Sequence, residues 1–445
     1  MKKSSLSIIC LGFFMVVMDV TIVNVALPSI KAALNTSMMG LEWVVDGYTL
    51  TFAAFLLVSG FLGGQYNTKR VFQFGIILFS LSSLGCGLSN SISQLVLLRV
   101  LQGIGAAFVL PNSLNLINQL STDELQRTKL IGIWAAIGGI AAAVGPIVGG
   151  LLTELMSWRS VFLVNVPLGL ICIIYIEKTI PTIILSSKRL NIDVIGQILG
   201  ILSIAALAFA LISVSDCGWV SAQSVIHFAL FILLLIAFIY SQLKVPSPML
   251  PIHLFKSKHF SIAVLVGLIM NIAFYGELFI LPLYFHQQMG LSIAKTGFAM
   301  IPLMLVTGIS SYLSSKFIQA IGAKLVMMIG FFIGVIGFIS LLMVIAFQFS
   351  YLLFILPLAL IGFGMAFIMP AATVVIISSV SNHYHGVASG AINMARQVGS
   401  LIGVAIFGSV ITSMITFTFG VEVTLMLACG LFMLGLIISL LVDQC

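Results

Sequence analysis

Charged side chains are scarce in this chain. Asp, Glu, Lys and Arg make up 7% of its 445 residues, whereas hydrophobic residues make up 61%. Soluble domains carry roughly 25% charged residues, so this chain lacks the polar surface that a soluble protein needs. Apolar runs long enough to cross a bilayer as a helix (about 18 residues or more) recur along its whole length. The composition therefore predicts a polytopic, all-α membrane protein.

The sequence also lacks the short motifs of several common chemistries. No P-loop, dinucleotide-binding fingerprint, G-x-S-x-G or H-E-x-x-H pattern occurs, so neither ATP hydrolysis nor common hydrolase chemistry is indicated. Its six cysteines form no C-x-x-C pair, and most lie in apolar runs as small buried residues do. The histidines of "HYH" at 383–385 have no carboxylate or thiol near them in sequence. We therefore expect no enzyme, no metal site and no cofactor.

The apolar runs predict fourteen membrane spans joined by short segments. They lie near residues 7–27, 44–64, 71–89, 94–118, 130–152, 160–178, 193–214, 224–243, 260–284, 296–315, 324–347, 350–377, 386–416 and 421–441. An even number places both termini on one side, which we expect to be the cytoplasm. Fourteen of the 19 lysines and arginines then fall inside and three outside, in line with the positive-inside rule. The net charge of +7 is thus a topology signal and indicates no nucleic-acid partner.

Two stretches far apart in the sequence are related. "LRVLQGIGAAFVLPNS" at 98–113 and "PLALIGFGMAFIMPAA" at 357–372 share the pattern G-x-G-x5-P, with Gly103 matching Gly362 at an offset of 259. Asp19, moved by the same offset, falls beside Glu277. The repeat predicts a six-helix half at 1–180, two inserted helices at 181–255 and a second six-helix half at 256–445. Transporters with two related halves hold substrate and ions near the midplane where the repeats meet.

Ionisable residues inside the predicted spans are the candidates for function, because each costs about 2.5 kcal/mol or more at the bilayer centre. We expect Asp19 and Glu277 to face a polar cavity, whereas Asp46 begins its span and could reach outside water. The alternative for Asp19 is a static ion pair or hydrogen-bonded carboxylate, with partners among Asn24, Gln102, Asn112, Asn115 and Asn393. The predicted substrate cavity comprises Asp19, Asn24, Asp46, Gln102, Asn115, Asn271, Glu277, Asn393 and Arg396.

A buried carboxylate suits proton coupling, since burial favours its neutral form and a nearby cation favours its charged form. Asp19 and Glu277 are therefore the predicted proton-coupling carboxylates. For Arg99 and Arg396, structural pairing and a proton-coupling role stay equally open. The fifth span contains "GPIVGG", formed by Gly145, Pro146, Gly149 and Gly150. Proline disturbs the preceding turn and small residues allow close helix contact. These residues predict either a bendable gate helix or ordinary small-residue packing.

Several motifs together match one family. They are "MDVTIVNVALP" (18–28), "LEWVVDGYTL" (41–50), "RVLQGIGAA" (99–107), "GPIVGG" (145–150), "WRSVFLVNVPLG" (158–169) and "GVASGAINMARQVGSLIGVAIFG" (386–408). With them the chain resembles the fourteen-helix drug:proton antiporter branch of the major facilitator superfamily over nearly its whole length. The resemblance implies proton-driven export, with Asp19 as the proton-linked carboxylate and Arg99 as the arginine associated with proton transfer. It also implies that the GPIVGG residues serve antiport and limit leak.

The predicted cytoplasmic loop between the second and third spans departs from the family pattern. The family carries G-x-L-[AG]-D-R-x-G-R-[RK] here, and this chain reads "GFLGGQYNTKR" from Gly60 to Arg70. Gly64 stands in place of the acid, while Lys69 and Arg70 keep the basic end. In the family that acid helps to close the cytoplasmic face. Another contact replaces it, or the transport cycle favours the inward-open state.

The sequence thus predicts an exporter of amphipathic or cationic small molecules in the bacterial inner membrane, driven by the proton motive force through alternating access. One alternative keeps this mechanism but exports a single endogenous metabolite, such as a siderophore. A second alternative is a membrane sensor or scaffold without transport. A channel suits the paired halves less well. The expected partners are protons, the substrate, the lipid bilayer and, as in some relatives, a periplasmic adaptor protein.

Overall fold

The computed structural model describes residues 3–65, 67–181, 193–219, 221–246, 248–381 and 384–442, and the regular elements in these ranges are all helical. Thirteen helices of the described residues are long and apolar enough to cross a membrane. The predicted span 44–64 falls in α2 (Met38–Gln65), a further helix that is not among these thirteen. The side chains of residues 57, 61, 64 and 65 in α2 lie outside the described set. The all-helical membrane fold is confirmed, and the count of fourteen spans stays a prediction.

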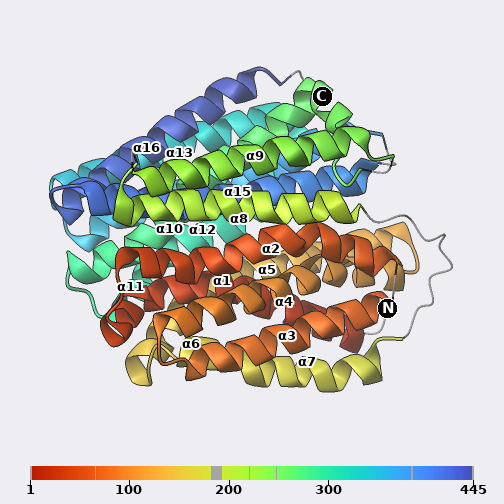
Figure 1. The fold of residues 1–445 in the computed structure, drawn as a ribbon, viewed down its shortest axis with the longest axis horizontal. Coiled ribbons are helices and arrows are strands. Elements are labelled where there is room, and N and C mark those ends of the chain that lie inside the picture. The colour runs from red at the N-terminus through yellow and green to blue at the C-terminus, as the bar shows by residue number, and fades with distance from the viewer. Residues whose placement is uncertain are drawn as a thin grey trace. The chain divides into compact units, whose positions relative to one another are not determined.

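The chain divides into two compact units. Unit 1 comprises Met1–Ile192 together with the short segment Ser292–Phe298 (Figure 1). Its helices are α1 (Lys3–Leu34), α2, α3 (Thr68–Leu88), α4 (Ile92–Leu120), α5 (Glu124–Leu155), α6 (Ser160–Leu163) and α7 (Asn165–Thr179), with most of the short α11 (Ile293–Ala299).

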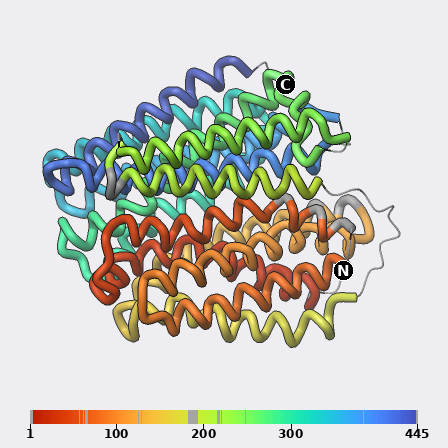
Figure 2. Tube along the Cα trace, in the orientation of Figure 1, coloured from red at the N-terminus to blue at the C-terminus, as the bar shows by residue number. Residues whose placement is uncertain are grey.

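Unit 2 comprises Asp193–Leu291 and Ala299–Cys445, and its chain can be followed from α8 onward in Figure 2. Its α-helices are α8 (Val194–Cys217), α9 (Ala222–Lys244), α10 (Lys258–Gln287), α12 (Ile301–Ile321), α13 (Ala323–Ala346), α14 (Ile355–Ser378), α15 (His385–Ser413) and α16 (Phe417–Leu440). Two 3₁₀ helices, η1 (Ile252–Lys256) and η2 (Tyr351–Phe354), precede α10 and α14. The predicted inserted helices are α8 and α9, and both cluster with unit 2.

In unit 1, α4 packs closely on two neighbours because glycine lines both contacts. Gly103 faces the backbone of Tyr48 on α2, and a Cβ at Gly105 would lie 2.6 Å from the backbone nitrogen of Phe79 on α3. The Thr51 hydroxyl on α2 donates to the carbonyl of Val100 on α4 at 2.8 Å. Small residues allow this close approach of helix backbones. The G-x-G pattern therefore fixes α2 and α3 against α4.

In unit 2, the matching glycines make the matching contacts. Gly362 faces the backbone of Leu303 on α12, and a Cβ at Gly364 would lie 2.6 Å from the carbonyl oxygen of Gly330 on α13. The extensive contact of α1 with α5 likewise has its counterpart in that of α10 with α15. The internal repeat seen in the sequence is thus present in the helix packing of the two units.

Polar caps mark where many of the helices begin. Asn67, Ser91 and Asp123 precede α3, α4 and α5, and each side chain accepts a hydrogen bond from a backbone N–H in the first turn. Asp193 and Thr416 do the same for α8 and α16. Such caps satisfy donors that the helix itself leaves unpaired. Short polar loops therefore end one span and begin the next.

Two predicted spans are each divided between two α-helices. The span 160–178 is divided at Val164 into α6 and α7. The span 296–315 is divided at Met300 into α11 and α12, and Pro302 lies in the first turn of α12. Proline has no N–H to donate to the preceding turn, and it favours the start of a helix. This chemistry separates α11 from α12, which hydropathy alone does not detect.

The α3–α4 contact gives a stability prediction. We expect Gly105→Val to lower the melting temperature of the purified protein by several degrees, because overpacking costs about 1–3 kcal/mol. Gly132→Val on α5 is the matched control, since a Cβ there meets nothing within 4 Å. The melting temperatures of both variants are measured by heating the protein and recording the loss of the folded peak in size-exclusion chromatography. Equal melting temperatures would contradict the close α3–α4 packing.

Candidate functional site

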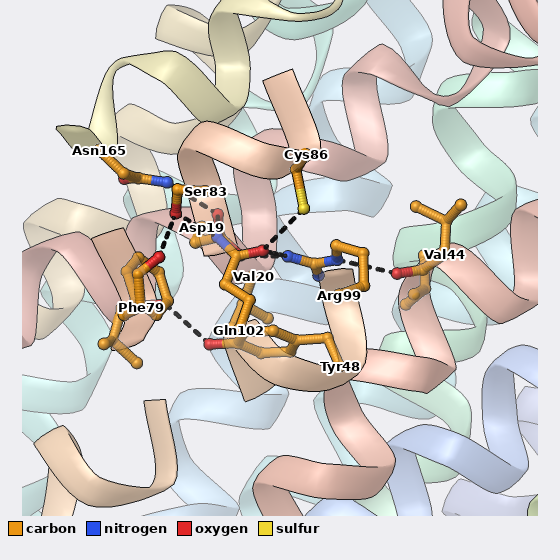
Figure 3. A network of polar contacts seen from close by, with 12 residues as sticks. Asp19, Val20, Val44, Tyr48, Phe79, Ser83, Cys86, Arg99, Gln102 and Asn165 are labelled. Atoms are coloured by element: carbon orange, nitrogen blue, oxygen red, sulfur yellow. Dashed lines mark hydrogen bonds and ion pairs between the residues drawn. The ribbon is translucent and has the colours of Figure 1, made fainter. Parts of the chain in front are cut away.

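A buried ion pair joins α1 to α4 inside unit 1. The Asp19 side chain is 0% exposed and the Arg99 side chain 2%, and Arg99 Nη1 donates to Asp19 Oδ2 at 2.5 Å (Figure 3). The Arg99 Nε donates to the backbone carbonyl of Val44 on α2 at 2.9 Å. The guanidinium thus links three helices through one carboxylate and one carbonyl.

Amide side chains complete the surroundings of the Asp19 carboxylate. Oδ1 accepts from Gln102 Nε2 and from Asn165 Nδ2, both at 2.9 Å. Gln102 also donates to Ser83 Oγ at 2.7 Å and accepts from Arg99 Nη1 at 2.7 Å, so it is shared between acid and base (Figure 3). Four helices, α1, α3, α4 and α7, therefore contribute to a single polar cluster.

Aromatic rings cover the guanidinium of Arg99. Its Cζ lies 4.2 Å from the ring centroid of Tyr48 on α2 and 5.8 Å from that of Phe162 on α6. Tyr48 and Phe162 are both almost fully buried. A cation over an aromatic face is attracted by the negative charge of that face. The rings therefore help to hold Arg99 in place without a second acid.

This cluster can exist in two charge states. With Asp19 ionised, attraction across a site that excludes water is strong, and both charges have hydrogen-bond partners. A proton bound to Asp19 removes the negative charge and leaves Arg99 as an uncompensated cation. The ion pair between α1 and α4 therefore depends on an attraction that a proton on Asp19 would remove.

Of the predicted partners of Asp19 in unit 1, Gln102 is the one with a hydrogen bond to its carboxylate among the described residues. Gln102 contacts the carboxylate, whereas the amide of Asn24 donates to Val20 on its own helix and Asn112 donates to Ser59 and Phe108. Asn115 lies half-buried on α4. The sequence reasoning missed Asn165. An amide within the apolar stretch "VFLVNVPLG" is the signal that could have found it.

Asp46 differs from its prediction as a residue at the end of a span. Because α2 begins at Met38, Asp46 lies two turns inside the helix and is 0% exposed. Neither carboxylate oxygen makes a hydrogen bond to a described residue. The apolar run that set the predicted boundary begins later than the helix does.

The GPIVGG residues of α5 pack on α1. Gly145 faces Thr21, and a Cβ at Gly149 would lie 2.7 Å from the carbonyl oxygen of Ile22. Pro146 lies between these contacts, within the continuous helix α5. The motif therefore serves close packing against the helix that carries Asp19. The gate role stays a prediction.

The same motif also receives the segment Ser292–Phe298 within unit 1. A Cβ at Gly150 would lie 2.9 Å from the carbonyl oxygen of Ile293, and Gly297 faces Pro146. At the end of α5, Glu154 Oε2 accepts from the backbone N–H of Ala294 at 2.6 Å. Glycine on both sides and one charge-assisted hydrogen bond hold this segment on α5.

The loop that departs from the family pattern is tied within unit 1. Lys69 Nζ lies 2.7 Å from Glu177 Oε2 on α7, and Thr68 Oγ1 donates to the carbonyl of Gly63 at 2.7 Å. Gly60 and Gly64 lie in the last turns of α2, and Arg70 is exposed on α3. The Lys69–Glu177 pair, which the sequence analysis did not foresee, anchors α3 to the end of α7.

In unit 2 the predicted cavity residues form a separate group on α10 and α15. Arg396 Nη1 donates to Asn393 Oδ1 at 3.2 Å, and Asn271 donates to the carbonyl of Gly267 at 2.7 Å. Arg396 Nε has no hydrogen-bond partner among the described residues. Among the described residues, Arg396 has no ion pair like that of Arg99. The predicted cavity residues fall in both units, and their combination into one cavity stays a prediction.

No cluster of three or more His, Cys, Asp or Glu side chains in the described part of the chain could hold a metal ion. Of the "HYH" residues, His383 lies outside the described residues.

Residues 9–404 match the Major Facilitator Superfamily. The methylenomycin A resistance protein of Bacillus subtilis is 34% identical over 408 residues, which cover 92% of this chain and 87% of that protein. The multidrug resistance protein Stp of Mycobacterium tuberculosis is 31% identical over 412 residues, covering 92% and 75%. The chain therefore belongs to the major facilitator superfamily. It is a multi-pass membrane transporter and not an enzyme.

Solved structures agree on the fold. The crystal structure of a D-xylose-proton symporter superposes with a TM-score of 0.73 over 99% of this chain and 98% of that chain, at 14% identity. So low an identity shows the fold alone. The resemblance found from the motifs is thus confirmed at the level of the superfamily and its drug-resistance members.

The Asp19–Arg99 pair gives a testable coupling energy. We expect Asp19→Asn and Arg99→Gln each to lower the free energy of unfolding by about 3–5 kcal/mol, because each leaves one buried charge unpaired. The double variant then loses much less than the sum. Thermal unfolding of both singles and the double measures the coupling.

The Lys69–Glu177 pair is the matched control for this cycle. Lys69 is 6% exposed, but the Glu177 side chain is 60% exposed, so water screens the pair from the Glu177 side. We therefore expect a coupling far below that of the fully buried pair and close to the roughly 0.2–1 kcal/mol of exposed pairs. Lys69→Met, Glu177→Gln and their double should therefore be nearly additive. Additive losses at Asp19 and Arg99 as well would contradict the ion pair.

Proposed function

We propose that this protein exports small amphipathic or cationic drugs from the cytoplasm in exchange for protons, through alternating access of its two units in the bacterial inner membrane. The observation that carries the proposal is the Asp19–Arg99 ion pair, buried in unit 1 with four helices around it. Its protonation is linked to helix position, which is the property that proton coupling needs. The drug-resistance relatives support the choice of substrate.

The proposed cycle follows from the two charge states of Asp19. Substrate binds from the inside while Asp19 is paired with Arg99, and the site then opens outward. A proton from outside neutralises Asp19, the pair separates and substrate leaves. Return to the inward state releases the proton and restores the pair. Fourteen spans, cytoplasmic termini and the absence of any cofactor belong to this proposal.

The proton motive force supplies enough free energy for such export. One elementary charge that crosses about 100 mV releases about 2.3 kcal/mol. Since 1.4 kcal/mol corresponds to a tenfold ratio, one proton supports roughly fifty-fold accumulation of a neutral substrate.

The breadth of substrates is a second question, and the relatives favour two answers. Two are named for resistance to the single antibiotic methylenomycin A, and others are multidrug proteins. A dedicated exporter of one compound is therefore the alternative to a broad pump. Recruitment of a periplasmic adaptor protein is a further part of the proposal that rests on the family resemblance alone.

Proton release from everted membrane vesicles tests the function. With an imposed pH gradient, we expect methylenomycin A or the cations ethidium and tetraphenylphosphonium to release protons from wild-type vesicles. Asp19→Asn should abolish that release, because the amide cannot take up the proton. A response to methylenomycin A alone would identify a dedicated exporter.

Asp193→Asn is the control for this experiment. Asp193 is a buried acid of unit 2 that caps α8 and accepts from Gln242 at 2.6 Å, and it is not one of the residues of the Asp19 cluster. We expect it to keep proton release once expression levels are matched. Equal release from wild type and Asp19→Asn would remove Asp19 from the coupling path.

A further inference from the structure

Unit 2 contains a buried acid one residue from the position that corresponds to Asp19. Glu277 lies on α10, is 2% exposed and falls within one residue of Asp19 moved by the repeat offset. The polar side chain that faces it is Thr424 of α16, which is 0% exposed. Thr424 is the counterpart of Asn165 at the offset of 259, and Asn165 is the partner of Asp19. The repeat has thus kept an acid on one helix and its polar neighbour on another.

The repeat has not kept the cation. The offset that relates Gly103 to Gly362 carries Arg99 to Leu358 and Gln102 to Ile361. Leu358 is 0% exposed and Ile361 1%, so both are core residues of α14. By the repeat, the positions that correspond to Arg99 and Gln102 thus hold buried hydrocarbon side chains in unit 2.

No other described charge in unit 2 takes the place of that arginine. The helices that pack on α10 are α14, α15 and α16, with η1 at its beginning. Apart from cysteine and Glu277 itself, the ionisable side chains on these helices are His385 and Arg396 on α15, Glu422 on α16, His253 and Lys256 on η1, and Lys258, His259, Tyr275, Tyr284 and His286 on α10, with none on α14. Lys258 is the exposed first residue of α10, about five helical turns from Glu277.

Arg396, the arginine nearest in kind to Arg99, belongs to the other face of α10. It lies close enough to Tyr275 for the two to interact electrostatically. Two residues along a helix correspond to about 200° around its axis, so Glu277 points away from the Tyr275 side. Both Glu277 oxygens lack a hydrogen bond of ordinary geometry among the described residues.

We infer that Glu277 is a second proton-binding residue, which holds its proton in this conformation as a neutral acid against Thr424. A carboxylate without a counter-charge is strongly disfavoured in a buried site, whereas its neutral form is tolerated. The Thr424 hydroxyl donates to the carbonyl of Val421 at 2.8 Å, which leaves its oxygen free to accept from the acid O–H. The protein therefore carries one ionised and one neutral buried acid, each within its own unit.

This assignment deepens the proposed function, on which its transport consequence rests. A proton on Glu277 is released only when movement of the surrounding helices admits water or a cation to the carboxyl group. Export that includes this release moves one proton more per cycle than export through Asp19 alone.

Infrared spectroscopy of the purified protein tests the protonation without any substrate. We expect the wild type at neutral pH to show a C=O stretching band of a protonated carboxyl group that is absent from Glu277→Gln. In Thr424→Val the band should move to higher frequency, because a methyl group replaces the hydroxyl that faces the acid. Identical spectra of wild type and Glu277→Gln in this region would show that Glu277 is ionised and overturn the inference.

Restoring the missing cation is the sharpest comparison. Leu358→Arg should remove the Glu277 band, since it places an arginine where Arg99 lies in the other unit, and Leu358→Met of similar volume should keep it. A folded Leu358→Arg protein that keeps the band would contradict the correspondence between the two sites.

The transport consequence is measured in proteoliposomes as protons moved per tetraphenylphosphonium exported. Glu277→Gln should lower this ratio, or stop export while tetraphenylphosphonium still binds, because the amide cannot release a proton. An unchanged ratio would exclude Glu277 from coupling. If the wild type exports none of the probe, the proposed function fails for that probe, whereas the infrared result still decides the protonation of Glu277.

Discussion

The structure depends on one requirement, that two opposite charges in the apolar interior of unit 1 be kept together. Neither Asp19 nor Arg99 is tolerated alone in such a site, because a lone charge there loses its hydration without compensation. The amides in contact with the pair compensate it: Gln102 bridges acid and base, and Asn165 donates to the acid. Gly103 and Gly105 bring α2 and α3 close enough to α4 to enclose it. The close helix packing therefore excludes water from the ion pair, and the ion pair links the packed helices.

The two units share their packing but not their chemistry. The glycines of α4 recur in α14 and contact equivalent helices. The acid recurs as Glu277, whereas the positions of Arg99 and Gln102 hold Leu358 and Ile361. The close contacts between helices require small residues in both units. The glycines are therefore kept although other residues of the two halves differ. A counter-charge is needed only where the acid stays ionised, and it can be lost where the acid becomes neutral.

The membrane class, the helical fold and the repeat could be predicted from the sequence, because hydropathy and glycine spacing report them directly. Asp19 and Arg99 were identified individually, since any charge in an apolar run stands out. Their pairing was only one of two alternatives, because it depends on how α1 and α4 are rotated against each other. Asn165 and the Lys69–Glu177 pair were missed for the same reason. Asp46 was misplaced because the apolar run begins after the helix does.

The segment Ser292–Phe298 imposes a mechanical condition on any movement between the units. It belongs to unit 1 by its contacts, yet the chain on both sides of it belongs to unit 2. Movement of one unit relative to the other must either bend the chain at the ends of the segment Ser292–Phe298 or detach the segment from α5. Gly290, just before this segment, has a positive φ of 65°. Just after the segment, Met300 interrupts the helix between α11 and α12. The Glu154–Ala294 hydrogen bond and the glycine contacts with α5 together oppose detachment of the segment.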